Sequence, residues 1–304
     1  MRGLDYRWLE ALDQVIAHGG FEPAADKLCI TQSAVSQRIK QLEKLTAQPV
    51  LVRSSPPKAT LAGKKLLRLY RQVTLLENEL LPELAGDSEQ EMITVSLATN
   101  ADSLATWLLP ALEDLMRQQR IELDLIVDNE LLTLDKIRTG EAIAAISSEP
   151  SPLPGCQADL LGMMEYICVC SPAFKTRFFA DGINSASISN APAVIFDQFD
   201  PLHAEFLYTH FNVTTEGWKS HLVRSSEAFI TMAELGVAYA SVPSLMVTDA
   251  LERGTLINMC PGKTLNRALY WHRFNTESGL LSKVSHACIN YAQQTLSQAK
   301  SGTD

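Results

Sequence analysis

The chain has 304 residues, of which 46% are hydrophobic and 20% charged, and its net charge at pH 7 is −9. These values are typical of a globular protein of about two domains, and they exclude a disordered chain. No apolar run approaches the roughly 20 residues that a bilayer requires, and the acid-containing start MRGLDYRWLEALDQ is not a secretory signal, so we expect a cytoplasmic protein.

The first predicted element is a helix from about Asp5 to Ala17. Leu9, Leu12 and Ile16 fall on one face of it, and the helical spacing ends at Gly19-Gly20. We expect this helix to pack over the two helices that follow.

The stretch from Phe21 to Leu45 predicts two short helices joined by a tight turn. Helical spacing of the apolar residues breaks over Cys29–Gln32 and resumes at Val35. Thr31 is a good N-cap for the second helix, because its hydroxyl can accept a hydrogen bond from a backbone N–H that would otherwise lack a partner. The face opposite the apolar stripe is polar or basic, with Ser33, Ser36, Gln37, Lys40 and Lys44. Such side chains bind base edges and phosphates, and a simply solvated helix face is the alternative.

The segment between Lys27 and Arg71 is strongly basic. It holds ten Lys or Arg residues and a single acid, Glu43, within a chain whose overall charge is negative. A basic segment in an acidic protein is the electrostatic footprint of phosphate binding, which favours a nucleic-acid surface here.

A short strand and a hairpin tip are predicted next. Val50 to Arg53 reads as the strand, and Ser54 to Lys58, with two prolines, reads as the tip or wing. Arg53 and Lys58 can each meet a phosphate, and Pro56 and Pro57 are stiff enough to lie along a groove wall. An ordinary surface turn is the alternative.

The run AADKLCITQSAVSQRIKQLEKL, followed by PVLVRSSPPKATLAGKKLL, resembles the winged helix-turn-helix of the LysR-type transcriptional regulators. The chain departs from the common pattern at Gln37, which precedes Arg38, and at Val52, where a Phe is usual. The resemblance implies double-stranded DNA as a partner. The residues predicted to contact DNA are Thr31, Gln32, Ser33, Ser36, Gln37, Arg38, Lys40, Arg53, Pro56, Pro57, Lys58 and Thr60.

From Leu61 to Leu84, after a cap at Thr60, the chain reads as one long helix. Its apolar seam is too wide for a single solvated helix, and consists of Leu66, Leu69, Tyr70, Val73, Leu76 and Leu80. A second copy of the helix is the simplest cover, which predicts a homodimer, and beyond it a homotetramer, presenting two recognition helices to two half-sites. Pro82 and Ala85 to Glu91 form the linker into the next domain.

From Met92 the pattern changes to alternating strands and helices. The first series has strands at Ile93–Ala98, Ile121–Val127 and Ala142–Ser147, and helices at Ser103–Arg117 and Leu131–Thr139. This order implies a parallel sheet with helices on both faces. The second series has strands near Tyr166–Val169, Val194–Phe196, His221–Val223 and Val237–Val242, then a strand at Ala268–Phe274 and a helix at Ser278–Ala299.

The predicted fold class is therefore α/β with a helix-dominated winged helix-turn-helix domain at residues 1–59. Residues 60–90 form a dimerisation helix and hinge, and residues 91–304 form a two-lobed effector domain like that of periplasmic binding proteins, by fold-level analogy. Lobe 1 spans about 91–162 and 267–304, and lobe 2 spans about 163–266.

Candidate ligand residues follow from the carboxyl ends of the strands, where ligands of open α/β sheets collect. The loops there carry Asn100, Asp102, Ser103, Asp128, Glu130 and Glu227. The four acids suit a cationic small molecule, although an acid near a helix N-terminus also stabilises the helix without any ligand.

The segments NADSLATWLLPAL, SSEAF and LYWHRF are similar to a branch of the LysR-type family that senses lysine and arginine. That resemblance implies one of these amino acids as effector. It places Asn100 and Ser103 near the carboxylate of the effector, and one or more of the acids near its ammonium or guanidinium group.

Catalytic and metal-binding patterns are absent from the sequence. It has no GxSxG, HExxH or Gly-rich phosphate loop, and its six cysteines show neither a CxxC pair nor zinc-finger spacing. We therefore expect reduced thiols, no metal and no cofactor.

The leading interpretation is a regulator of basic amino-acid transport or metabolism that contacts DNA, an effector and RNA polymerase. The alternatives are an effector-independent nucleoid or replication-origin binder, an enzyme and a pure solute-binding protein.

Overall fold

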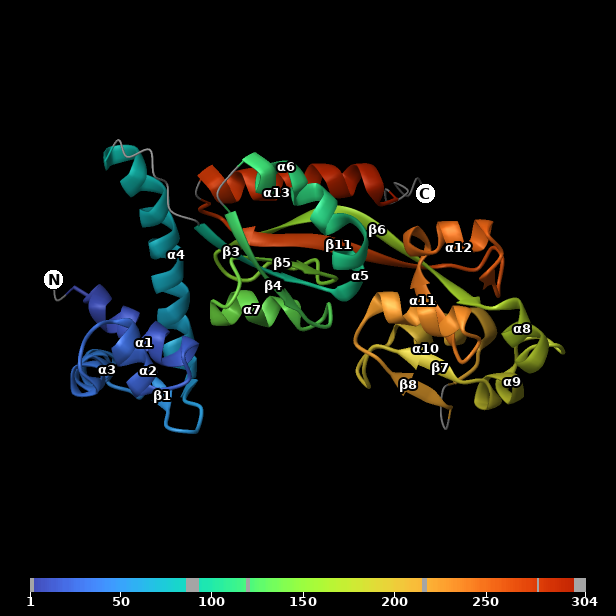
Figure 1. Cartoon of the computed structure of the whole chain (residues 1–304), viewed down its shortest axis with the longest axis horizontal. Helices are drawn as coiled ribbons and strands as arrows, with labels where there is room; N and C mark the ends of the chain where they lie inside the picture. Colours follow the sequence, from blue (N-terminus) through green and yellow to red (C-terminus); the bar gives the residue numbers. More distant parts are fainter. Residues whose placement is uncertain (1–2, 86–92, 119–120, 215–217, 278, 298–304) are drawn as a thin grey trace.

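The computed structural model of the chain describes residues 3–85, 93–118, 121–214, 218–277 and 279–297. They form a helical amino-terminal domain, one long helix and an α/β body of two lobes (Figure 1). The fold class predicted from the sequence is confirmed. Most of the predicted linker, residues 86–91, lies outside the described residues. None of the described helices has the length and apolar character needed to cross a membrane.

The amino-terminal domain consists of three helices and a small hairpin. Its elements are α1 (Tyr6–Ala17), α2 (Phe21–Lys27), α3 (Gln32–Thr46), β1 (Leu51–Val52) and β2 (Lys58–Ala59), of which β1 and β2 pair antiparallel. Leu12, Val35 and Leu42 are fully buried and belong to one core, so the stripes predicted from spacing do face each other. Thr31 caps α3, because its hydroxyl accepts a hydrogen bond from Ala34 N at 3.2 Å.

The long helix α4 (Leu61–Ala85) uses its apolar seam for two purposes. Leu66 and Tyr70 pack against the core of the amino-terminal domain, whereas Leu69, Leu76 and Leu80 are exposed. Leu66 and Tyr70 are half-buried in this way because α1 contacts the start of α4 within the protomer, and the dimer interface along the seam stays a prediction.

One continuous sheet runs through both lobes, in the order β4-β3-β5-β11-β6-β9-β7-β8, with β10 paired to β6. The strands of lobe 1 are β3 (Ile93–Thr99), β4 (Ile121–Val127) and β5 (Ala144–Ser147), and those of lobe 2 are β7 (Ala193–Ile195), β8 (Ser220–Leu222), β9 (Tyr239–Pro243) and β10 (Ile257–Asn258). The parallel pairing predicted for the first series is present, since β3 runs parallel to β4 and β5. β6 (Cys156–Cys170) and β11 (Leu265–Phe274) pair antiparallel and cross from one lobe to the other (Figure 1).

Helices cover both faces of lobe 1. α5 (Ala101–Ser103), a π-helical turn at Leu104–Leu108 and α6 (Leu109–Gln118) form one helical run, which lies with α13 (Gly279–Thr295) on one face, while α7 (Thr133–Thr139) lies on the other (Figure 1). Lobe 2 carries α8 (Pro172–Phe178), α9 (Ser185–Asn190), α10 (Leu202–Phe211), α11 (Ser226–Glu234), a 3₁₀ turn at Ser244–Met246 and α12 (Thr248–Glu252).

Three predicted boundaries are corrected. The strand near Tyr166–Val169 is the end of the much longer β6, whose first half mixes polar and apolar residues without alternation. The helix predicted from Ser103 begins at Ala101, because the side chain of Asn100 caps it. The helix predicted from Leu131 begins at Thr133.

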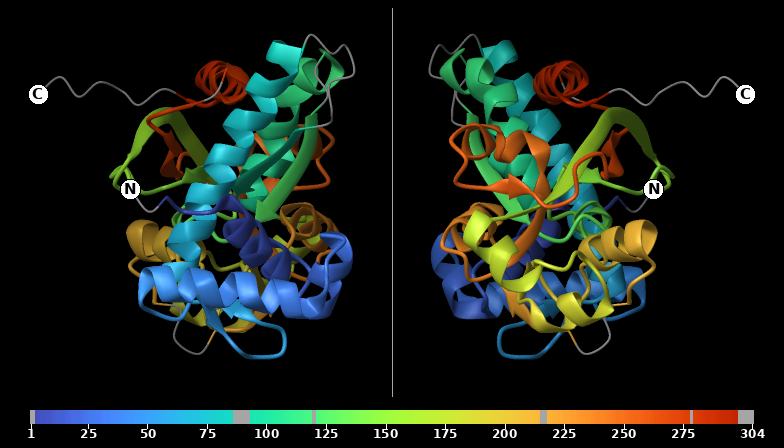
Figure 2. Two further views of the ribbon diagram at one scale, coloured as in Figure 1. Left: turned by 90° about the vertical axis from the view of Figure 1, so that its left-hand side faces the viewer. Right: turned by 90° about the vertical axis from the view of Figure 1, so that its right-hand side faces the viewer.

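Helix α4 docks on lobe 1 beside the end of α7 (Figure 2). Arg71 links three parts of the chain, since its Nε lies 2.8 Å from Asp13 Oδ1 on α1 and its Nη1 donates to the carbonyl of Gly140 at 2.6 Å. Gly140 has a φ of +73°, and a Cβ there would lie 2.6 Å from the Cα of Arg68. The amino-terminal domain is therefore held against lobe 1 by a contact that requires glycine.

Candidate functional site

The first candidate surface is the polar face of α3 together with the wing. Gln32, Ser33, Gln37 and Lys40 are exposed, and Ser36 is half-buried. On the wing, Arg53, Pro56 and Lys58 are exposed and Pro57 is half-buried. A groove between helix and wing is lined by Phe21, Gln32, Ser33, Ser36, Arg53, Ser54 and Pro57. The fold thus brings side chains suited to bases and phosphates onto one open surface.

Four of the predicted DNA-contacting residues have side-chain partners within the protomer: Thr31, Ser33, Arg38 and Thr60. Arg38 lies 3.5 Å from Glu10 of α1, and 25% of its side chain is exposed. The hydroxyl of Thr60 donates to the carbonyl of Pro49 at 2.8 Å and accepts from Gly63 N at 3.1 Å. Since the Thr31 hydroxyl caps α3, these residues shape the surface as well as bordering it.

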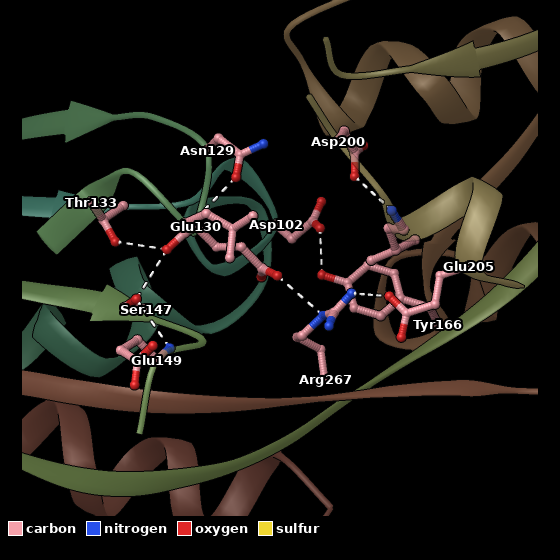
Figure 3. Close-up of polar contacts among 12 residues, drawn as sticks. Asp102, Asn129, Glu130, Thr133, Ser147, Glu149, Tyr166, Asp200, Glu205 and Arg267 are labelled. Carbon is pink, nitrogen blue, oxygen red and sulfur yellow. Dashed lines mark hydrogen bonds and ion pairs between the residues drawn. The ribbon is translucent and has the colours of Figure 1, made fainter. Parts of the chain in front are cut away.

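The second candidate site is a partly open cavity between the two lobes. It is lined by Asn100, Ala101, Asp102, Asp128, Asn129, Glu130, Tyr166, Phe196, Asp200, Pro201, Leu202, Ser226, Phe229 and Ser241. Figure 3 shows acids from both sides of this space pointing towards it. Of the six residues predicted to bind ligand, Asn100, Asp102, Asp128 and Glu130 therefore line one cavity.

The other two predicted ligand residues are placed differently. Ser103 is fully buried at the start of the helical run behind Asn100. Glu227 is exposed and accepts a hydrogen bond from the Ser225 hydroxyl at 2.9 Å, so Ser226, its neighbour at the start of α11, lines the cavity in its place.

Sequence reasoning missed Asp200, Tyr166 and Arg267. Asp200 lies in the loop after β7, where the rule on strand ends would have found it. Tyr166 and Arg267 lie on the crossing strands β6 and β11, and no local pattern indicates where a crossing strand passes a cavity.

Asp102 joins the lobes. Its two carboxylate oxygens accept hydrogen bonds from the Tyr166 hydroxyl at 2.6 Å and from the Ser226 hydroxyl at 2.5 Å. Burial raises the pKa of Asp102, while these two hydroxyl donors act to lower it. Both donors are neutral, so no cationic side chain compensates this carboxyl when it is ionised, and a ligand cation can do so.

The other acids of the cavity differ in their partners. Burial raises the pKa of Glu130 to about 7, although the guanidinium of Arg267, with Nε 3.1 Å from Oε1, acts to lower it. Burial also raises the pKa of Asp200, which accepts from Leu202 N at 3.0 Å. Asp128 lies 3.5 Å from Lys136.

Two buried hydroxyls lack partners: that of Ser241, which lines the cavity, and that of Ser103, which lies outside the lining behind Asn100. Neither Ser103 Oγ nor Ser241 Oγ has a hydrogen-bond partner among the described residues. Buried polar atoms are normally satisfied, so an unpaired hydroxyl beside a cavity indicates that a polar ligand completes the site. Buried carboxylates likewise favour a cation, which compensates for their lost hydration.

Metal ligation does not fit the described residues, since none of their clusters of His, Cys, Asp and Glu could hold a metal ion. All six cysteines are unpaired, and five of them are buried.

Comparison with known proteins points to one family. Residues 6–64 match the family described as bacterial regulatory helix-turn-helix protein, lysR family, and residues 88–294 match the LysR substrate binding domain. The chain is 54% identical to the HTH-type transcriptional regulator ArgP of Photobacterium profundum over 98% of this chain and 100% of that protein. It is 52% identical to ArgP of Vibrio parahaemolyticus over the same shares.

Two solved structures are similar along their whole length. ArgP from Mycobacterium tuberculosis has a TM-score of 0.87 and 31% identity, covering 98% of this chain and 100% of that one. LysG from Corynebacterium glutamicum, with bound effector Arg, has a TM-score of 0.78 and 28% identity, covering 97% and 100%.

Proposed function

Because the chain belongs to the LysR family of bacterial transcriptional regulators, we propose that lysine or arginine binds between its lobes and modulates its binding to DNA. The observation that carries the proposal is the acidic cavity. Asp102, Asp128, Glu130 and Asp200 line one space, and the unpaired hydroxyl of Ser241 belongs to the same lining. The arginine bound to the similar LysG protein supports the same ligand class.

The effector would lie with its two ends in different parts of the cavity. Its carboxylate would meet the start of the helical run at Ala101, where backbone N–H groups and the Ser103 hydroxyl are close to Asn100. Its side-chain cation would then reach Asp102 and Asp200, which face each other from opposite lobes (Figure 3).

Effector binding would change DNA binding by shifting the population of lobe arrangements. A cation between Asp102 and Asp200 draws the lobes together, and α4 connects lobe 1 to the domain that carries α3.

The protein would act as a homodimer, and as a homotetramer of such dimers, through the exposed residues Leu69, Leu76 and Leu80 of α4. Bound near promoters of basic amino-acid transport or metabolism genes, it would contact RNA polymerase.

Titration calorimetry on the full chain tests this proposal. We expect arginine and lysine to bind, and their neutral counterparts citrulline and norleucine to bind about tenfold more weakly or worse, because a charge-assisted bond to a buried carboxylate is lost. Asp102→Asn should weaken the binding of both cationic amino acids. Equal binding of all four compounds, or no binding of arginine and lysine, would show that the cavity does not select a cationic amino acid.

A further inference from the structure

Arg267 occupies a position between the two walls of the cavity. It lies on β11 where that strand passes from one lobe to the other, and it pairs with one acid from each side (Figure 3). Its Nε is 3.1 Å from Glu130 Oε1, and its Nη2 donates to Glu205 Oε2 at 2.7 Å. The side chain is 21% exposed, so the guanidinium is largely shielded from water.

Both acids are held by the lobe to which they belong. The backbone carbonyl of Glu130 accepts from the Thr133 hydroxyl at 3.1 Å and from the Ser147 hydroxyl at 3.0 Å, which fixes its loop to lobe 1. Glu205 lies in the first turn of α10, the helix whose start at Leu202 lines the cavity in lobe 2. Arg267 therefore connects a loop of lobe 1 to a helix of lobe 2.

The acids of the cavity fall into two kinds by their partners. Asp128 and Glu130 have a cationic side chain beside them, Lys136 and Arg267 respectively. Asp102 and Asp200 are held by neutral donors, which are hydroxyls for Asp102 and the N–H of Leu202 for Asp200. A ligand cation thus meets its least compensated charge at Asp102, because Arg267 pairs with Glu130 and also acts electrostatically on Asp200.

We propose that Arg267 is a specificity-determining residue, an internal guanidinium that occupies the Glu130 carboxylate and so prevents the cavity from favouring arginine over lysine. This inference rests on the proposed binding of cationic amino acids. An arginine guanidinium pairs with a carboxylate through two parallel hydrogen bonds, whereas an ammonium acts as a point charge. Because Glu130 also lines the cavity, its release frees a carboxyl that the guanidinium of a bound arginine can pair with and ionise in place of Arg267, at a pH of about 8 where the carboxyl gives up its proton most readily.

Calorimetry of Arg267→Gln with lysine and with arginine tests the proposal. We expect the ratio of the lysine Kd to the arginine Kd to rise about tenfold or more over the wild-type ratio, because only arginine gains the paired bonds to Glu130. Arg267→Lys keeps a cation beside Glu130, and its ratio should stay within about threefold of the wild-type value. Glu205→Gln leaves Arg267 on Glu130 and should leave the ratio unchanged.

Arg273→Gln is the matched control. Arg273 lies on the same strand and pairs with two acids, Asp159 at 2.9 Å and Glu277, but these lie outside the cavity lining. Its loss should leave the Kd ratio unchanged, with thermal melting reporting the folded state of each variant.

A Kd ratio in Arg267→Gln equal to that of the wild type would overturn the inference. If, in addition, both amino acids bind more weakly by the same factor, the role of Arg267 is purely structural. If the wild-type chain binds neither amino acid, the proposed function itself is wrong and this inference falls with it.

Discussion

At the scale of single residues, Glu130 makes effector binding depend on pH near neutrality. Its pKa is raised by burial to about 7, so the side chain is neutral below that value and anionic above it. A cationic effector is attracted to the anionic form. The affinity for arginine should therefore increase as the pH rises from about 6 to about 8, by less than tenfold per pH unit, since a single group titrates.

Calorimetry of arginine binding across this pH range measures the effect, with Glu130→Gln as the control. The variant removes this carboxyl, and its affinity should rise less steeply between about pH 6 and 8 than that of the wild type, because only Asp102 and Asp200 remain as buried acids with a raised pKa. A wild-type affinity that falls as the pH rises would contradict the assignment.

The cavity-lining residues could be predicted from the sequence where a loop follows the carboxyl end of a parallel strand. The carboxyl ends of parallel strands pointed to Asn100, Asp102, Asp128 and Glu130, all of which line the cavity. Spacing alone could not reveal that Arg38 pairs with Glu10, because the partner lies on another helix and the contact depends on how α1 packs on α3.

At the scale of elements, the docking of α4 on lobe 1 depends on Gly140. Alanine there would put a Cβ 2.6 Å from the Arg68 Cα and 2.8 Å from its N, in addition to the strain of a φ of +73°. Gly182 has a φ of +87° and nothing within 4 Å of the added Cβ, so Gly182→Ala reports the backbone strain alone, about 1–3 kcal/mol.

Thermal melting of both variants tests this contact. Gly140→Ala should lower the melting temperature more than Gly182→Ala does, because α4 must move away from lobe 1 to admit the new methyl group. Equal shifts would mean that the docking of α4 contributes nothing to stability.

Elements were predicted best where one neighbour covers one face. The helices α1 and α3 have a single apolar stripe each, and the predicted stripes are buried except at Ile16, which is half-buried. The seam of α4 has different neighbours along its length, which include the amino-terminal core at Tyr70 and lobe 1 at Val73, so periodicity could not distinguish them from a second copy. The first half of β6 lacks alternation, and its partners lie on β11, far along the chain, so no local pattern indicated this strand.

At the scale of the whole molecule, an acidic chain presents one basic segment to DNA. Duplex binding through that segment should weaken steeply as salt rises, because Lys and Arg release counterions from the phosphates. The cavity lies in a different part of the molecule from α3, and α4 with its Arg71 contacts is the physical connection between them. Composition and charge pattern were enough to predict a basic DNA-binding segment within an otherwise acidic chain. The way α4 docks on lobe 1 required the structure.

The most direct test of effector-controlled DNA binding is fluorescence anisotropy on a labelled duplex that the full chain has selected from a random-sequence pool. Saturating arginine or lysine should change the Kd of the wild-type chain for this duplex by about fivefold or more, a typical coupling between two sites. Asp102→Asn should bind the same duplex and lose the response. Identical wild-type binding curves with and without both amino acids would contradict control of DNA binding from the cavity.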